Sequence, residues 1–139
     1  MTATDPGLYE AACAHPDGDA TAARLAQTAR RYGYDGLVIR TREADVDAEA
    51  LWERYDVDVV PAIEVVAEEP SSASGAVGNF RPDYPLVLVR GGTDALNRFA
   101  VEQERVDVLA APLSGEGGFN HVLAKAAATH GTRVEFDLG

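Results

Sequence analysis

The sequence predicts an α/β protein wound as an incomplete (β/α) TIM-like barrel, and three observations lead to that class. Short apolar segments alternate with segments of helical periodicity along the whole chain. The connections between them are short, which favours parallel strands joined by right-handed crossovers. No GxGxxG fingerprint follows the first apolar segment, which argues against a dinucleotide-binding Rossmann domain. A closed eight-stranded barrel usually needs at least ~200 residues. For a chain of 139 residues we therefore expect one partial barrel domain over 1–139, with about six parallel strands and the last βα units missing.

Six segments are expected to be strands because they are apolar and bounded by glycine, proline or acidic turn residues. Several are apolar at consecutive positions, which is typical of strands covered on both faces. The expected strands are residues 8–15, 36–40, 57–66, 85–90, 106–111 and 133–138.

Helices are expected between most of these strands, each beginning at a polar residue that can cap it. Residues 70–85 are rich in serine, glycine and proline and have little periodicity, so we predict a long exposed loop there. The expected N-caps are the Asp17-Gly18-Asp19 turn, Asp47, Thr93 and Asn120, and the expected terminating glycines are Gly33 and Gly131.

Charge and apolar runs exclude several classes of protein. The chain carries 23 acidic and 12 basic residues, a formal net charge of −11, which excludes a generic basic nucleic-acid binder. No apolar run approaches the ~18 residues of a membrane span, so no membrane partner is expected. The first seven residues lack the basic and apolar parts of a secretory signal. We therefore expect a cytoplasmic protein.

The basic residues indicate adaptation to high salt. Lys125 is the only lysine, whereas arginine occurs eleven times. Molar salt shortens the Debye length to about 3 Å and screens the mutual repulsion of the excess carboxylates. The alternative is an ordinary acidic protein adapted to low salt, and the composition favours a halophilic protein.

Several short segments, taken in order, form a recognisable pattern. They are Tyr9-Glu10-Ala11, Pro16-Asp17-Gly18, Arg31-Tyr32-Gly33-Tyr34-Asp35-Gly36, Val89-Arg90-Gly91-Gly92, Arg105-Val106-Asp107-Val108-Leu109, and Gly117-Gly118-Phe119-Asn120-His121-Val122-Leu123-Ala124. In this order they resemble the family of ribonuclease P protein component 3, an archaeal relative of a eukaryotic RNase P subunit. The resemblance covers nearly the whole chain, and it rests on the order of the segments because none of them is highly specific alone.

The resemblance implies a non-catalytic protein subunit of an RNA-based endonuclease that matures the 5′ end of precursor tRNA. In that family the RNA subunit performs the cleavage with metal ions, so the protein itself is expected to bind no cofactor. The implied partners are RNase P RNA, precursor tRNA and other RNase P protein subunits, especially a small RRM-like one. The isolated chain is not expected to be catalytic.

The alternative function is a PHP-like metal-dependent phosphoesterase with a degenerate ligand set, because that superfamily shares the same kind of barrel. Such enzymes open with a His-x-His pair, whereas the matching stretch here keeps only His15. His121 and His130 are nine residues apart in one predicted helix, not at the i, i+4 spacing of a joint metal site. The lone Cys13 excludes a cysteine-clustered zinc site. No catalytic or metal-ligating residues are therefore assigned.

Carboxylates also lie at or near predicted strand ends, where complete barrels place catalytic groups. They are Glu64, Glu135 and Asp137. Because no base partner is identifiable, solvated surface charge is the favoured interpretation.

Arginines at strand ends are the better candidates for contact with RNA. Arg40 and Arg90 each end a predicted strand, and Arg42 lies just beyond the first of them. The carboxyl ends of parallel strands share one face, and guanidinium forms bidentate hydrogen bonds to phosphate. The Gly91-Gly92 pair allows close approach of a backbone ahead of a helix N-terminus. A salt bridge at the barrel rim is the alternative role for these arginines.

A second candidate is the glycine-rich loop before the last helix. Backbone N–H groups of Gly117 and Gly118 could form a nest for an anion, and Phe119 could stack on a base. Asn120 and His121 follow as further candidate RNA contacts. The alternatives are a flexible loop with a core phenylalanine, and a helix cap at Asn120.

Overall fold

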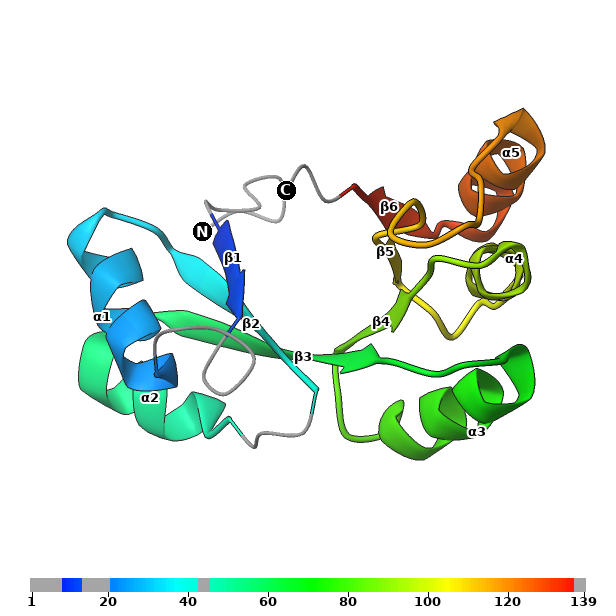
Figure 1. Cartoon of the computed structure of the whole chain (residues 1–139). Helices are drawn as coiled ribbons and strands as arrows, with labels where there is room; N and C mark the ends of the chain where they lie inside the picture. The colour runs from blue at the N-terminus through cyan, green and yellow to red at the C-terminus, as the bar shows by residue number, and fades with distance from the viewer. Residues whose placement is uncertain (1–8, 14–20, 43–45, 137–139) are drawn as a thin grey trace. The chain divides into compact units, whose positions relative to one another are not determined.

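A computed structural model describes residues 9–13, 21–42 and 46–136, and it divides the chain into two compact units, 1–62 and 63–139. Strands and helices alternate along the chain (Figure 1). The strands are β1 (Tyr9–Cys13), β2 (Gly36–Thr41), β3 (Asp58–Val65), β4 (Leu86–Arg90), β5 (Val108–Ala110) and β6 (Arg133–Glu135). The helices are α1 (Ala22–Arg31), α2 (Ala48–Tyr55), α3 (Pro70–Phe80), α4 (Asp94–Glu102) and α5 (His121–His130).

Strand neighbours follow chain order, β1-β2-β3 in the first unit and β3-β4-β5-β6 in the second. The pairs β1–β2, β4–β5 and β5–β6 are parallel. A doubly wound sheet reverses its strand order at a switch point, whereas a barrel adds each strand beside the previous one. The prediction of an incomplete TIM-like barrel with six strands is therefore confirmed.

Local capping chemistry sets the helix ends of the first unit. Thr21 caps α1, because its side chain accepts a hydrogen bond from Arg24 N at 3.2 Å. The expected cap in the Asp17-Gly18-Asp19 turn is wrong, since the helix begins later, and that turn lies outside the described residues. Gly33 follows α1 with φ +81°, as expected of a terminating glycine. Asp47 caps α2 as predicted, with its Oδ1 3.0 Å from Ala50 N.

The first unit buries small and branched side chains between its helices and strands. Ala26 and Ala29 of α1 are buried and pack against the β2 side chains Leu37 and Ile39. The remaining buried members of this core are Leu51, Val57 and Val59.

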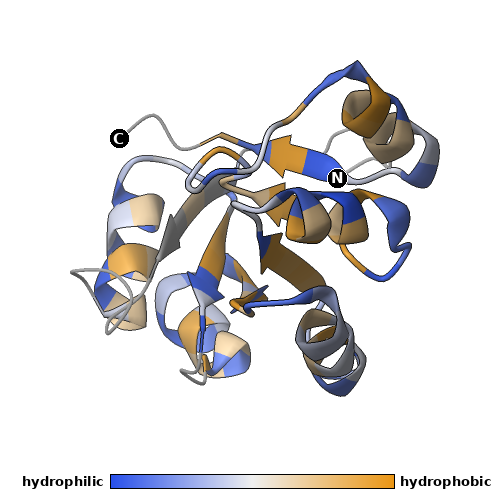
Figure 2. Cartoon of the chain, turned by 45° about the vertical axis from the view of Figure 1, so that its right-hand side comes forward, coloured by the Kyte–Doolittle hydropathy of each residue, from blue (hydrophilic) through white to orange (hydrophobic). Residues whose placement is uncertain are grey.

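The second unit has its own core, built from alternate strand positions. Ile63 and Val65 of β3 and Val87 and Val89 of β4 are buried among side chains of the surrounding helices. Because side chains alternate across a strand, Glu64 and Arg90 lie on the opposite face from these residues. In Figure 2 hydrophobic colour follows strand segments, whereas the helices carry mixed colours typical of amphipathic elements.

Residues 70–80 form helix α3, so the predicted exposed loop over 70–85 is wrong for most of its length. Pro70 occupies the first helical turn, where its missing N–H costs nothing. Ala73 and Val77, one helical turn apart, are fully buried in the core of the second unit. Burial of this small apolar stripe outweighs the poor helix propensity of the serines and glycines.

The ends of α4 and α5 agree with the predictions. Thr93 accepts from Leu96 N at 3.1 Å, and Asn120 accepts from Val122 N and Leu123 N at 3.0 and 3.1 Å. Gly131 ends α5 with φ +72°. Among the residues that the structure describes, no helix has the length and apolar character to cross a membrane.

Candidate RNA-binding site at the strand ends

The predicted site residues are divided between the two units. Arg40 lies in β2 opposite Cys13 and is half-buried, and Arg42 is exposed immediately after that strand. Neither arginine is without an interaction partner. Arg90, at the end of β4, belongs to the second unit. A common face for all three arginines therefore stays a prediction.

Arg90 is paired with a buried carboxylate. Its Nη1 lies 4.0 Å from Glu64 Oε1, and the side chains are 30% and 3% exposed. A carboxylate this deeply buried needs a compensating charge or hydrogen bonds, because burial removes its hydrating water. The strand-end salt bridge expected as the alternative role is therefore present. Since a guanidinium has five N–H donors, this pairing does not exhaust its capacity to bind an anion.

The register of the strands places a second carboxylate near Arg90. Arg90 pairs with Ala110 of β5, and Ala110 pairs with Glu135 of β6. Glu135 is therefore two strands away on the same face, with only a methyl side chain between. Asp137, the third predicted strand-end carboxylate, lies outside the described residues.

The predicted anion nest does not form, because its N–H groups are donated within the protein. Gly91 N donates to Ala110 O at 2.7 Å, and Gly117 N donates to Gly92 O at 2.8 Å. Gly118 N donates to Asp94 Oδ1 at 2.9 Å, and Gly92 N donates to Asn97 Oδ1 at 3.0 Å. These glycines serve to let two loops approach one another. A Cβ on Gly91 would lie 2.1 Å from Asn97 Oδ1.

Asn97, which was not among the predicted site residues, joins the two loops of this site. It is fully buried on α4. Besides accepting from Gly92 N, its Nδ2 donates to Pro112 O and Gly118 O, both at 3.0 Å. The sequence signal for this role is that Asn97 stands within the apolar pattern of a predicted helix, because a buried polar side chain requires hydrogen-bond partners. The β4–α4 and β5–α5 loops are therefore one cross-linked structure.

The residues that follow the glycines have structural partners. Phe119 is half-buried against the core of the second unit and contacts Phe136 edge-to-face, with ring centroids 5.8 Å apart. The core alternative for Phe119 and the cap alternative for Asn120 are therefore confirmed. His121 is the exposed first residue of α5.

The structure brings no metal-binding cluster together in its described part. Among residues 9–13, 21–42 and 46–136, no group of three or more His, Cys, Asp and Glu side chains is placed to hold a metal ion. His15 lies outside that part. His121 and His130 stand at the two ends of α5.

Comparison with known proteins identifies the family. The family model described as RNase P subunit p30 matches residues 7–139. The chain is 58% identical over 142 residues to ribonuclease P protein component 3 of Halorubrum lacusprofundi, covering 95% of this chain and 59% of that protein. It is 57% identical over 135 residues to the protein of that name from Haloarcula marismortui, covering 95% of this chain and 57% of that protein. It is 36% identical over 138 residues to the protein of that name from Methanosarcina mazei, covering 96% of this chain and 57% of that protein.

A solved structure shares the fold. A chain of the cryo-EM structure of archaeal ribonuclease P with mature tRNA superposes with a TM-score of 0.71, at 22% identity over 90% of this chain and 56% of that one. The present chain thus spans somewhat more than half the length of the relatives it matches. None of these relatives supports the phosphoesterase alternative. A match over residues 7–139 and relatives named alike show that the chain belongs to the RNase P subunit p30 family.

Proposed function

We propose that this chain is a protein subunit of ribonuclease P, which supports RNA-catalysed 5′ maturation of precursor tRNA by binding RNA and partner subunits. The observation that carries the proposal is the 57–58% identity to two RNase P component 3 proteins across 95% of the chain. The chemistry of cleavage, with its metal ions, belongs to the RNA subunit in this proposal. The chain contributes binding and positioning, in the cytoplasm.

Arg90 is the residue that the geometry favours for contact with RNA in the second unit. The buried Glu64 carboxylate holds the guanidinium at the end of β4, while part of the side chain is exposed. An arginine held in place loses little conformational entropy when it binds phosphate, and its hydrogen bonds survive salt better than diffuse attraction does. A few such contacts would allow a protein of net charge −11 to bind RNA in brine.

The β4–α4 loop begins directly after this arginine and is fixed by its hydrogen bonds to the β5–α5 loop. Their N–H groups are used internally, so we expect RNA to be contacted by side chains, chiefly Arg90 and the exposed His121. Arg40 and Arg42 are the corresponding candidates in the first unit. A small RRM-like subunit is the proposed protein partner.

Capture of RNA from cells tests the function. The tagged chain is expressed in Haloarcula marismortui, whose component 3 is 57% identical, and is purified in molar KCl before the bound RNA is sequenced. We expect enrichment of RNase P RNA and of tRNA precursors with 5′ leaders over an equally acidic unrelated protein. The same recovery for both proteins would overturn the proposal.

Arg90→Gln tests the site within the same experiment. We expect it to lower the recovered RNase P RNA several-fold, because a phosphate contact is lost. Arg98→Gln is the matched control, since Arg98 is an exposed α4 arginine paired with Glu102 at 3.1 Å. Equal recovery with both variants would remove Arg90 from the RNA-binding surface.

A further inference from the structure

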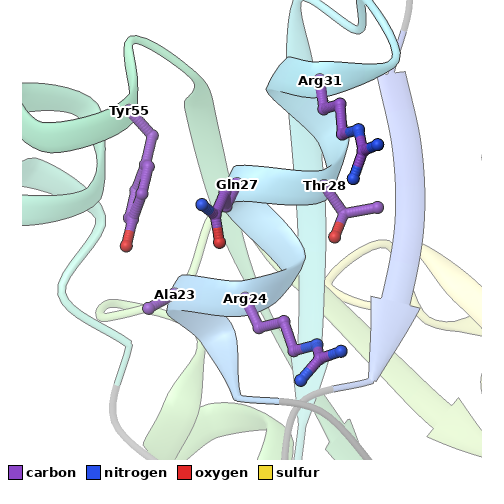
Figure 3. A pocket seen from close by; sticks show the side chains of 6 residues that line it. All are labelled: Ala23, Arg24, Gln27, Thr28, Arg31 and Tyr55. Atoms are coloured by element: carbon purple, nitrogen blue, oxygen red, sulfur yellow. The ribbon is translucent and has the colours of Figure 1, made fainter.

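A groove on the first unit carries a second set of polar groups, which were not among the predicted site residues. It has a volume of about 410 Å³ and is lined by α1 and the last residue of α2. In Figure 3 Gln27 of α1 points toward Tyr55 of α2. Arg24, Thr28 and Arg31 lie in a row along α1, on the side away from Tyr55. The lining residues are Ala23, Arg24, Gln27, Thr28, Arg31 and Tyr55.

The helix that lines this groove has an unusual charge for so acidic a chain. α1 carries three arginines and no acidic residue, whereas the whole protein has a net charge of −11. Arg30 is ion-paired with Asp56 at 3.7 Å. Within the described part of the chain, Arg24 and Arg31 have no carboxylate within ion-pair distance. No described carboxylate thus compensates the two groove arginines, in contrast to Arg30 on the same helix.

The spacing of the groove residues suits an extended anionic polymer. Arg24, Thr28 and Arg31 are four and seven positions apart, so they share one helical face. A rise of 1.5 Å per residue separates the two arginine Cα atoms by about 10 Å along the helix axis, a distance over which a nucleic-acid strand presents more than one phosphate. Between them, the Gln27 amide and the Thr28 hydroxyl can donate to phosphate or ribose oxygens.

Exposed aromatic rings accompany these arginines. Tyr32 follows Arg31 directly and is 71% exposed. Trp52 is 53% exposed, and it lies three positions before Tyr55 on α2, where residues so spaced are neighbours. Rings of this kind stack on unpaired bases, with about 1–3 kcal/mol per base. An acidic protein partner would satisfy the arginines but offers no bases to stack on the rings, so the combination favours RNA.

We propose that this groove binds the phosphate backbone of RNase P RNA, with Arg24 and Arg31 each holding a phosphate and Tyr32 or Trp52 stacking on a base beside it. The inference rests on the proposed function and adds an RNA contact in the first unit. It also explains how a strongly acidic protein binds RNA, since the local charge of α1 is opposite to the net charge.

The test is a filter-binding titration of the full chain with RNase P RNA of Halorubrum lacusprofundi, from about 0.5 to 3 M KCl. Arg24→Gln/Arg31→Gln should weaken binding about 10-fold or more, and the slope of log K against log [KCl] should become shallower by about 1.5. Arg30→Gln is the matched control: it removes an arginine from the same helix but outside the groove, and it should change affinity less than twofold. Circular dichroism confirms that both variants keep the parent's fold.

The outcomes separate this inference from the proposed function. If the parent binds the RNA but the double variant matches it in affinity and slope, the groove assignment is wrong and the proposed function stands. Equal losses in the double variant and Arg30→Gln would also refute the groove, since bulk charge would then explain both. If the double variant keeps the parent's RNA affinity but recovers less of a partner subunit than the parent when expressed in Haloarcula marismortui, the groove is a protein interface. A parent that binds the RNA no better than a scrambled RNA would overturn both proposals.

Discussion

Asn97 is a buried side chain that links two loops of the second unit. Asn97→Ala would leave one buried N–H and two carbonyl groups without their partner, which costs about 2–4 kcal/mol of unfolding free energy. Urea unfolding measures the loss, and hydrogen exchange should locate it at the Gly92 amide. Arg98→Ala, an exposed change at the next position, should stay within about 0.5 kcal/mol. Equal stability of the two variants would contradict the linking role of Asn97.

The protonation of Tyr9 makes the stability of the first unit depend on pH in the alkaline range. Its hydroxyl donates to Asp58 Oδ2 at 2.5 Å. That hydrogen bond, then burial, then the charges of Asp58 and Asp35 raise the pKa of Tyr9 above 10.0. A raised pKa means that the folded state holds the proton more tightly, so its stabilising effect is present below about pH 10 and is lost as pH rises through the folded pKa.

Alkaline melts of the parent and Tyr9→Phe test this coupling. The parent should lose more stability than the variant as the pH rises above about 10. Asp58→Asn, which removes the acceptor charge, should lower the tyrosinate titration midpoint of Tyr9. Parallel stability curves for the parent and Tyr9→Phe would rule the coupling out.

At the scale of one element, α3 tests whether burial overrides helix propensity. Gly75 lies in the middle of α3, and a Cβ added there would project into open space. Gly75→Ala should therefore stabilise the chain by about 0.5–1 kcal/mol, because alanine has the better helix propensity and the less flexible unfolded state. Gly78→Ala is the comparison, since a Cβ there would lie 3.1 Å from Arg105 Nη1, and it should gain less. Thermal unfolding decides, and a destabilising Gly75→Ala would contradict the helix.

At the scale of the whole molecule, the charge of −11 with one lysine predicts a strong dependence of stability on salt. Raising KCl from about 0.2 to 3 M should increase Tm by about 10 °C, equivalent to about 3 kcal/mol for a chain of this size. Sucrose is the control, because it favours burial without screening charge. Equal midpoints at the two KCl concentrations, or an equal gain in sucrose, would refute the screening explanation.

The order of strands and helices could be predicted from the sequence because its signals are local. Asp47, Thr93 and Asn120 cap their helices through N–H groups two or three positions away. The family resemblance was equally accessible, since it depends on the order of short segments. Helix α3 was missed because its buried apolar stripe is short, chiefly Ala73 and Val77, within a serine- and glycine-rich segment.

The sequence by itself determined the barrel-like succession of elements, the acidic character and the family; tertiary structure alone decided which partners the candidate site residues meet. Gly118 N meets a carboxylate 24 positions away, and Arg90 meets Glu64 26 positions away. No short-range pattern encodes such partners, because chain folding brings them together. The same holds for the α1–α2 groove, where Tyr55 joins a face set by Arg24 and Arg31. Local chemistry determines the elements, and packing between distant segments selects which polar groups remain available to a ligand.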